Sequence, residues 1–116
     1  MDVLGFDACL MGMAEVYYQF RALADVCVAS EESEPEDGWP YDTILSVLKS
    51  NPTMSPGSFG QLIVNKYIES YSTSSGQYET LSAINLTKQD ALASAIYTVA
   101  TELDDHMAEY LSLIHI

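Results

Sequence analysis

The sequence predicts an α/β fold in which helices flank a layered sheet. Short β-branched runs alternate along the 116 residues with longer stretches of helical periodicity, in the order strand, helix, strand, two helices, strand, helix. Hydrophobic residues make up 48% of the chain, which is enough to form a core and argues against a disordered chain. Three strands are few for such a sheet, so we expect part of a domain with exposed sheet edges.

Three elements and a loop are predicted in the first 40 residues. Residues 1–7 (MDVLGFD) are a short apolar run and predict a strand. Apolar side chains recur at helical spacing over residues 10–24, which predicts an amphipathic helix. Residues 25–29 (DVCVA) are β-branched and predict a buried strand. Residues 30–40 (SEESEPEDGWP) have the composition of a loop.

Two helices are predicted next. The first covers residues 41–49 and ends before Pro52, because proline cannot continue a helix. The second begins at Ser55 and Pro56, since serine is a favoured N-cap and proline fits the first helical turn. Its predicted apolar stripe consists of Phe59, Leu62, Ile63, Tyr67 and Ile68.

The last predicted elements are a turn, a strand and a helix. Residues 72–76 (STSSG) predict the turn, and residues 78–86 (YETLSAINL) predict the strand. Residues 87–90 (TKQD) resemble a capping box and predict a helix that runs to about Tyr110.

The charge of the chain excludes some classes of partner. It carries 17 acidic and 4 basic side chains, for a formal net charge of −13. A phosphate backbone or an anionic membrane surface requires a basic patch, whereas the four cations here are scattered. No apolar run reaches the roughly 18–20 residues that span a bilayer, and Asp2 and Asp7 interrupt what would be a signal peptide. We therefore expect no nucleic acid partner and no membrane span.

Cys9 is the first candidate for chemistry. It stands where the first strand leads into the first helix, and open α/β folds place their sites at that edge of the sheet. A helix N-terminus next to the thiol would favour the thiolate. The alternative is a core cysteine, because cysteine is among the most often buried residues.

Asp7 lies two residues before Cys9, on the same face of a strand. A carboxylate beside a thiol raises the thiol pKa, so Asp7 fits a group that binds a positively charged substrate better than it fits a base. An arginine or lysine side chain of the substrate would pair with it. Capping of the next helix is an equally good interpretation on spacing alone.

Four long segments carry a family resemblance. GFDACLMGMAEV (residues 5–16) and VASEESEPEDGWPYD (residues 28–42) resemble the clostripain-like cysteine peptidases, family C11 of clan CD. The similarity continues through MSPGSFGQLIVNKYIESY (residues 54–71) and TLSAINLTKQDALASAI (residues 80–96). The related caspase signature Gln-Ala-Cys-x-Gly is kept at Ala8-Cys9, with Asp7 in place of the glutamine.

The resemblance implies a partial caspase-like α/β/α sandwich and an endopeptidase that cleaves protein or peptide substrates after arginine or lysine. It implies Cys9 as the nucleophile and Asp7 in the specificity pocket. Ser30 and Glu31 fall where relatives build the wall of that pocket. The segment from Gly38 to Tyr41 is a family hallmark that fits an architectural role. The resemblance also implies secretion or a place at the cell surface.

No cofactor is required by the sequence. Five acids lie between Glu31 and Asp37, and hard cations bind carboxylates, so calcium is an alternative that the resemblance also suggests. The spacing of these acids does not match an EF-hand loop, and Pro35 restricts the backbone. A solvated loop without a metal is therefore the preferred interpretation.

The chain departs from the family pattern in one large respect. Relatives carry a catalytic histidine followed by glycine upstream of the cysteine, whereas only eight residues precede Cys9 and none is histidine. His106 lies in the last predicted helix and fits a solvated helix face. We therefore expect half of a Cys-His dyad, inactive alone and completed by a missing N-terminal part of the domain. The alternative is a non-catalytic acidic binding module.

The final six residues need a separate explanation. LSLIHI at residues 111–116 matches one reading frame of a common transposon-based sequencing adapter. We therefore expect residues 111–116, including His115, to be an adapter scar. Residues 1–110 are then the C-terminal part of an incomplete clostripain-like peptidase domain. The alternative is a helix tail that happens to match.

Overall fold

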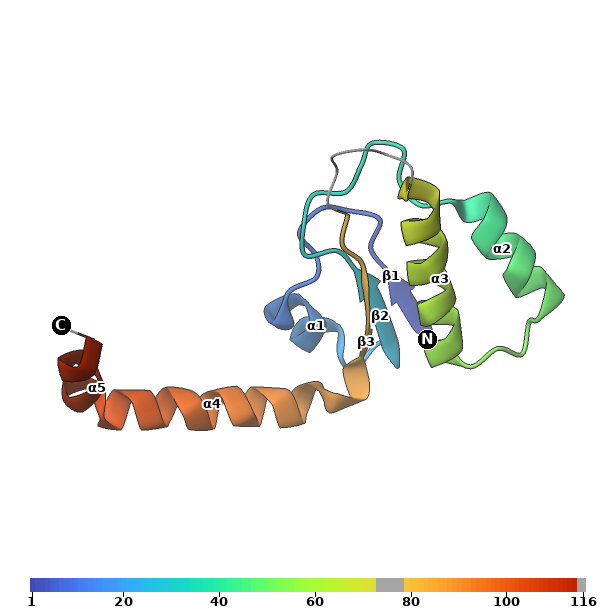
Figure 1. Ribbon diagram of the computed structural model, residues 1–116. Coiled ribbons are helices and arrows are strands. Elements are labelled where there is room, and N and C mark those ends of the chain that lie inside the picture. The colour runs from blue at the N-terminus through green and yellow to red at the C-terminus, as the bar shows by residue number, and fades with distance from the viewer. Residues whose placement is uncertain (73–78, 115–116) are drawn as a thin grey trace.

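The computed structural model describes residues 1–72 and 79–114 of the chain (Figure 1). Three strands, one short 3-10 helix and five α-helices follow each other in these residues: β1 Val3–Gly5, α1 Ala14–Phe20, β2 Val26–Ala29, α2 Tyr41–Ser50, α3 Pro56–Tyr71, β3 Ser82–Asn85, η1 Leu86–Lys88, α4 Gln89–Asp105 and α5 Met107–Ile114. The predicted order of strands and helices is confirmed. The predicted turn at residues 72–76 lies largely outside the described residues.

The sheet has the strand order β1-β2-β3. β1 pairs with β2 in parallel, with Leu4 opposite Cys27. β3 pairs with the other side of β2 in the antiparallel sense, with Ile84 opposite Cys27. β2 is therefore the central strand, which explains why all four of its residues are buried.

Alternating residues of β2 contribute to two separate cores. Val26 and Val28 pack with Ile63 and Tyr67 of α3 and with Ile44 of α2. Cys27 and Ala29 face the other side and pack with Tyr17 of α1 and Leu86 of η1. Successive side chains of a strand point to opposite faces, so one four-residue strand holds both helical layers together. Figure 1 shows α1 on one side of the sheet and α3 with α2 on the other, which confirms the α/β/α layering.

The start of α3 agrees with the sequence prediction. The Ser55 side chain accepts a hydrogen bond from the Ser58 backbone N–H, and Pro56 is the first helical residue. This cap satisfies one of the N–H groups that a helix start leaves unpaired. Close packing against the sheet follows, since a side chain at Gly60 would lie 3.0 Å from Val26.

The first and last helices differ from the prediction. The helix expected over residues 10–24 covers only Ala14–Phe20. The helix expected to run unbroken to about Tyr110 is interrupted at His106, which separates α4 from α5. The helical spacing of apolar residues continues past the ends of α1 and through His106. Hydrophobic spacing alone therefore does not locate these helix ends.

α4 extends away from the sheet, and α5 lies at its far end (Figure 1). The radius of gyration is 18.1 Å, against about 13 Å for a compact domain of this length. The apolar side chains Leu92, Ile96, Val99 and Leu103 of α4 are between 43% and 59% exposed. No helix in the described part of the chain is both long and apolar enough to cross a bilayer.

Candidate active site

The segment after β1 runs beside the loop that leaves β2. The Phe6 N–H donates to the Val28 carbonyl at 2.9 Å, which extends the β1–β2 pairing by one residue. The Leu10 N–H donates to the Glu32 carbonyl at 3.1 Å, and the Gly12 N–H donates to the Ser30 carbonyl at 2.7 Å. Asp7 and Cys9 are therefore carried at the carboxyl end of β1, next to residues 30–34.

These backbone contacts explain why α1 begins late. Leu10 adopts a left-handed conformation with φ of 60°, which is incompatible with an α-helix at that residue. A Cβ at Gly12 would lie 2.7 Å from the Ser30 backbone, so only glycine permits this close approach. The predicted helix start at Leu10 was wrong because the backbone of residues 10–12 bonds to the β2 loop instead.

The Cys9 thiol is exposed and receives a backbone hydrogen bond. The Glu34 N–H lies 3.2 Å from Cys9 Sγ, and the Glu34 carbonyl lies 3.9 Å from the same atom. The helix dipole expected at Cys9 is absent from this position, because α1 begins five residues later. The Glu34 amide supplies the donor in its place.

Asp7 bonds to residues at the start of α2. Its Oδ2 accepts from the Tyr41 hydroxyl at 2.8 Å and from the Trp39 backbone N–H at 3.3 Å. α1 has Met13 at its N-cap, without a side-chain cap, so Asp7 does not cap the helix that follows it. Of the two interpretations left open by spacing, capping of the next helix was wrong.

Gly38 permits this arrangement of Asp7. Its φ is +64°, a region that side chains with a Cβ rarely adopt, and a Cβ there would lie 2.8 Å from Asp7 Oδ2. The Tyr71 hydroxyl donates to the Gly38 carbonyl at 2.6 Å and fixes the turn from the α3 side. Trp39 and Tyr41 thus hold the Asp7 carboxylate, and Gly38 leaves room for it.

Glu34 is a member of the site that the sequence analysis missed. Its Oε2 accepts from the Trp39 indole N–H at 2.9 Å, and its Oε1 is buried with no hydrogen-bond donor among the described residues. Burial raises the pKa of the Glu34 carboxyl to about 8, with further contributions from a hydrogen bond to Asp7 and from the charge of Asp7. Glu34 therefore bonds to Cys9 through its backbone, and the charge of Asp7 acts on its carboxyl.

The other two predicted site residues have different surroundings. Ser30 is fully buried, and its hydroxyl bonds to the Thr80 hydroxyl at 3.0 Å and to the Glu32 carbonyl at 3.0 Å. These bonds join the loop after β2 to the chain before β3. Glu31 is exposed, and its charge contributes to the raised pKa of Tyr17 on α1. Asp7 and Cys9 thus both lie near Glu34, whereas the Ser30 side chain is buried.

Within the described residues, no histidine and no cluster of metal ligands lies beside Cys9. His106, the one histidine within the described residues, lies between α4 and α5 at the end of the chain farthest from the sheet (Figure 1). His115 lies outside the described residues. No three His, Cys, Asp or Glu side chains converge as metal ligands in residues 1–72 and 79–114.

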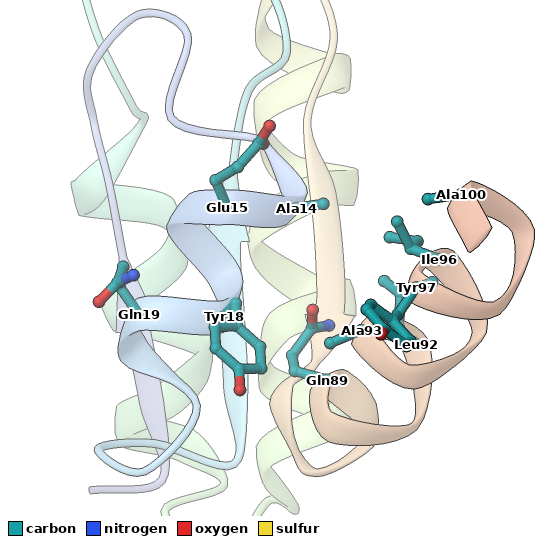
Figure 2. Close-up of a pocket in the computed structure, with 10 residues that line it drawn as sticks. All are labelled: Ala14, Glu15, Tyr18, Gln19, Gln89, Leu92, Ala93, Ile96, Tyr97 and Ala100. Atoms are coloured by element: carbon teal, nitrogen blue, oxygen red, sulfur yellow. The ribbon is translucent and has the colours of Figure 1, made fainter. Parts of the chain in front are cut away.

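A separate apolar groove lies between α1 and α4, away from Cys9. Figure 2 shows Tyr18 of α1 across from Leu92, Ile96 and Tyr97 of α4, with Gln89 between the two helices. Arg21, at the end of α1, forms a 2.7 Å ion pair with Asp90 of α4. The residues that line this groove include the carboxylate of Glu15 but no cysteine, serine, threonine or histidine. The candidate active site is therefore the Cys9 cluster.

Comparisons with known proteins identify the family. A sequence model of the Clostripain family matches residues 1–116. Clostripain of Hathewaya histolytica is 30% identical over 131 residues, which cover 90% of this chain and 25% of clostripain. A secreted C11 cysteine protease from Bacteroides thetaiotaomicron, solved with an irreversible peptide inhibitor, is 30% identical with a TM-score of 0.68, over 82% of this chain and 29% of that chain. An inactive zymogen C11 protease from Parabacteroides distasonis is 30% identical with a TM-score of 0.67, over 81% of this chain and 25% of that chain.

The chain thus spans between 25% and 29% of the length of these relatives. The similarity in structure confirms the predicted caspase-like α/β/α architecture. The match of sequence over the whole length and the match of fold agree: the chain belongs to the clostripain family of C11 cysteine proteases.

Proposed function

We propose that this chain is the cysteine-bearing part of an endopeptidase that cleaves after arginine or lysine. The observation that carries the proposal is the position of Cys9, an exposed thiol at the carboxyl end of β1 with the Glu34 N–H 3.2 Å from sulfur. The thiol lies beside an Asp7 carboxylate held by Tyr41 and Trp39. A nucleophile and a cation-binding carboxylate occur together at one sheet edge, where α/β folds place their sites.

Cys9 would act as the nucleophile in two steps. Its thiolate attacks the scissile carbonyl carbon, the C–N bond breaks, and an imidazole proton goes to the leaving amine. Water then hydrolyses the resulting thioester and restores the thiol. The Cys9 N–H is a local donor for the oxyanion, and the histidine would come from a part of the protein outside residues 1–116.

Asp7 would select the side chain before the cleaved bond. A guanidinium or ammonium group of the substrate would form a charge-assisted hydrogen bond with this carboxylate. Arginine and lysine substrates would therefore bind Asp7. Ser30 would position the pocket wall through its bonds to Thr80 and Glu32, and Glu31 would lie at the exposed rim.

The remaining part of the domain would complete the fold. β1 is an edge strand in the described sheet, and its outer edge offers unpaired backbone groups to a further strand. The exposed apolar face of α4 would be covered at the same time. We propose residues 1–110 as the C-terminal part of the peptidase domain and residues 111–116 as the adapter scar. The full protein would be secreted or held at the cell surface.

The test uses the complete protein, obtained by extending the reading frame in the source DNA and expressing the result. A set of matched peptides differs only at the residue before the cleaved bond, with arginine, lysine, citrulline, glutamate or leucine there. We expect cleavage after arginine and lysine at rates at least about tenfold above the neutral and acidic residues. A protein that binds these peptides without cleaving any of them would contradict the proposal and favour the acidic binding module.

The Gly38→Ala substitution is expected to destabilise the complete protein by about 1–2 kcal/mol, the cost of a left-handed conformation for a residue with a Cβ. The added Cβ also approaches Asp7 Oδ2. Chemical denaturation measures the free energy of unfolding. Gly57→Ala is the matched control, because its Cβ meets nothing within 4 Å and alanine favours the helix. Equal effects of the two substitutions would contradict the proposed need for glycine at residue 38.

The raised pKa of Glu34 also predicts how stability varies with pH. The folded protein holds a proton on Glu34 up to about pH 8, whereas the unfolded carboxyl loses its proton near the ordinary value of 4.5. Between these values the folded state binds more protons, so the Glu34 contribution to the free energy of unfolding falls as pH rises. Denaturation at several pH values should show this decline relative to Glu34→Gln. A constant difference between the two proteins would contradict the assigned protonation.

A further inference from the structure

The Glu34 backbone contacts the Cys9 sulfur with both of its polar groups. Its N–H lies 3.2 Å from Cys9 Sγ, and its carbonyl oxygen lies 3.9 Å from the same atom. Cys9 is exposed, and an exposed side chain without such contacts rotates between staggered conformations. The direction of the sulfur therefore depends on where the Glu34 backbone lies.

The loop that carries Glu34 is attached to the fold on both sides of its contact with Cys9. Before this contact, the Glu32 carbonyl accepts from the Leu10 N–H at 3.1 Å. After it, Glu34 Oε2 accepts from the Trp39 indole N–H at 2.9 Å. The first bond fixes the backbone next to β1, and the second fixes the Glu34 side chain.

Trp39 can hold Glu34 in place because its own ring is buried. The Trp39 side chain is 7% exposed and belongs to the core that contains Val28 of β2 and Tyr67 of α3. A Cβ at Gly5 would lie 2.8 Å from the ring, so the ring also lies directly against the end of β1. The indole N–H therefore has a defined position relative to the strand that leads to Cys9.

A tight turn brings Glu34 and Trp39 together. The Gly38 N–H donates to the Pro35 carbonyl at 3.0 Å, and Gly38 has a φ of 64°. Pro35 restricts Glu34 to an extended backbone, because the proline ring clashes with a helical conformation of the residue before it. The Glu34 carboxyl, with a buried Oε1, is directed into the fold, whereas its backbone is directed to the exposed Cys9.

Building on the proposed function, we propose that Glu34 and Trp39 are positioning residues for the Cys9 nucleophile. The indole N–H holds the Glu34 carboxyl, and the Glu34 backbone holds the sulfur in the direction from which it attacks the substrate. Glu34 acts in this role as a hydrogen-bond acceptor, and its charge is not required. Loss of the indole bond should slow the attack, because a misplacement of about 1 Å at the reacting atoms can cost about 10²-fold in rate.

Two substitutions of Glu34 separate the acceptor from the charge. Glutamine keeps an oxygen that accepts from the Trp39 indole, whereas alanine removes it. In the complete enzyme with an arginine peptide, we expect Glu34→Ala to lower kcat by about 10- to 100-fold and to change KM by less than about threefold. Glu34→Gln should keep kcat within about threefold of the unaltered enzyme. Glu36→Ala is the matched control, since Glu36 is an exposed acid of the same loop, and it should change neither constant.

Trp39→Phe removes the donor of the same bond. Phenylalanine keeps an aromatic ring in the core and the backbone N–H that donates to Asp7. If both residues act through one bond, kcat should fall by a similar factor, and the double variant with Glu34→Ala should fall no further than the more impaired single variant. Chemical denaturation checks that each variant is folded, and the Glu34 variants test the proposal by themselves if Trp39→Phe does not fold.

Labelling of Cys9 by a peptide acyloxymethyl ketone that ends in arginine isolates the attack of the sulfur from release of the amine. The rate constant at saturating reagent should fall in Glu34→Ala by the same factor as kcat. Equal losses in Glu34→Ala and Glu34→Gln would overturn the proposal, because the charge would then be the property that matters. An unchanged kcat in Glu34→Ala, or a loss confined to KM, would also overturn it. The unaltered enzyme would still cleave after arginine in these cases, and the proposed function fails separately if it does not.

Discussion

Replacement of Cys9 by alanine is expected to lower kcat/KM of the complete enzyme for arginine peptides by about 10⁴-fold or more, the scale on which loss of a catalytic nucleophile acts. The physical reason is that no thioester can form without the sulfur. The effect should appear in kcat rather than in substrate affinity, because Asp7 and the pocket remain. Steady-state hydrolysis of a fluorogenic arginine peptide measures it, together with calorimetry for binding.

Cys27 provides a matched control for the loss of a thiol. It is fully buried in the centre of β2, and burial raises the pKa of its thiol to about 11. Cys27→Ala should leave kcat/KM within a factor of a few and lower the free energy of unfolding by about 1 kcal/mol through lost packing. Retained cleavage by Cys9→Ala, or equal loss in both variants, would show that Cys9 is not the nucleophile.

Replacement of Asp7 by asparagine is expected to lower kcat/KM for arginine peptides by about 10²–10³-fold, the scale expected when one partner of a hydrogen-bonded charge pair with the substrate is lost. Asparagine still accepts hydrogen bonds from the Tyr41 hydroxyl and the Trp39 N–H, so the turn before α2 should persist. The citrulline peptide should lose much less. The arginine to citrulline ratio measured in parallel separates the charge effect from a general loss of activity.

Asp2→Asn is the matched control for this charge. Asp2 is exposed before the amino end of β1, at the opposite end of the strand from Asp7. Its replacement should leave both rates within a factor of two or so. Equal losses for the arginine and citrulline peptides in Asp7→Asn would contradict a role for Asp7 in binding the substrate cation.

The fold class could be predicted because it depends on local patterns. The β-branched run that forms β2 and the Ser55-Pro56 start of α3 are both encoded within a few residues. The burial of Cys27 agrees with the buried strand predicted over residues 25–29. The late start of α1 could not be predicted, because it depends on Gly12 bonding to Ser30, 18 residues further along the chain. The helical periodicity that begins at Leu10 gives no indication of this hydrogen bond.

The candidate site was predicted only in part. Asp7 and Cys9 stand out because they lie two residues apart and match a family motif. Glu34 does not, because it is one of five acids in residues 31–37 and nothing local distinguishes it. Its carboxyl is turned inward by the Trp39 indole, and the partners of Asp7 at residues 39 and 41 lie more than 30 residues away from it. Such contacts are set by tertiary packing and have no signature in the local sequence.

The most direct test of the central claim is covalent labelling of the complete protein with a peptide acyloxymethyl ketone that ends in arginine. A nucleophilic thiolate displaces the acyloxy group of such a reagent and forms a thioether, and mass spectrometry of the digested protein locates it. We predict the label on Cys9, with labelling at least about tenfold slower by the citrulline analogue. A label on another residue, or equal rates for the two reagents, would contradict the assignment of Cys9 as the nucleophile and Asp7 as the residue that selects its substrate.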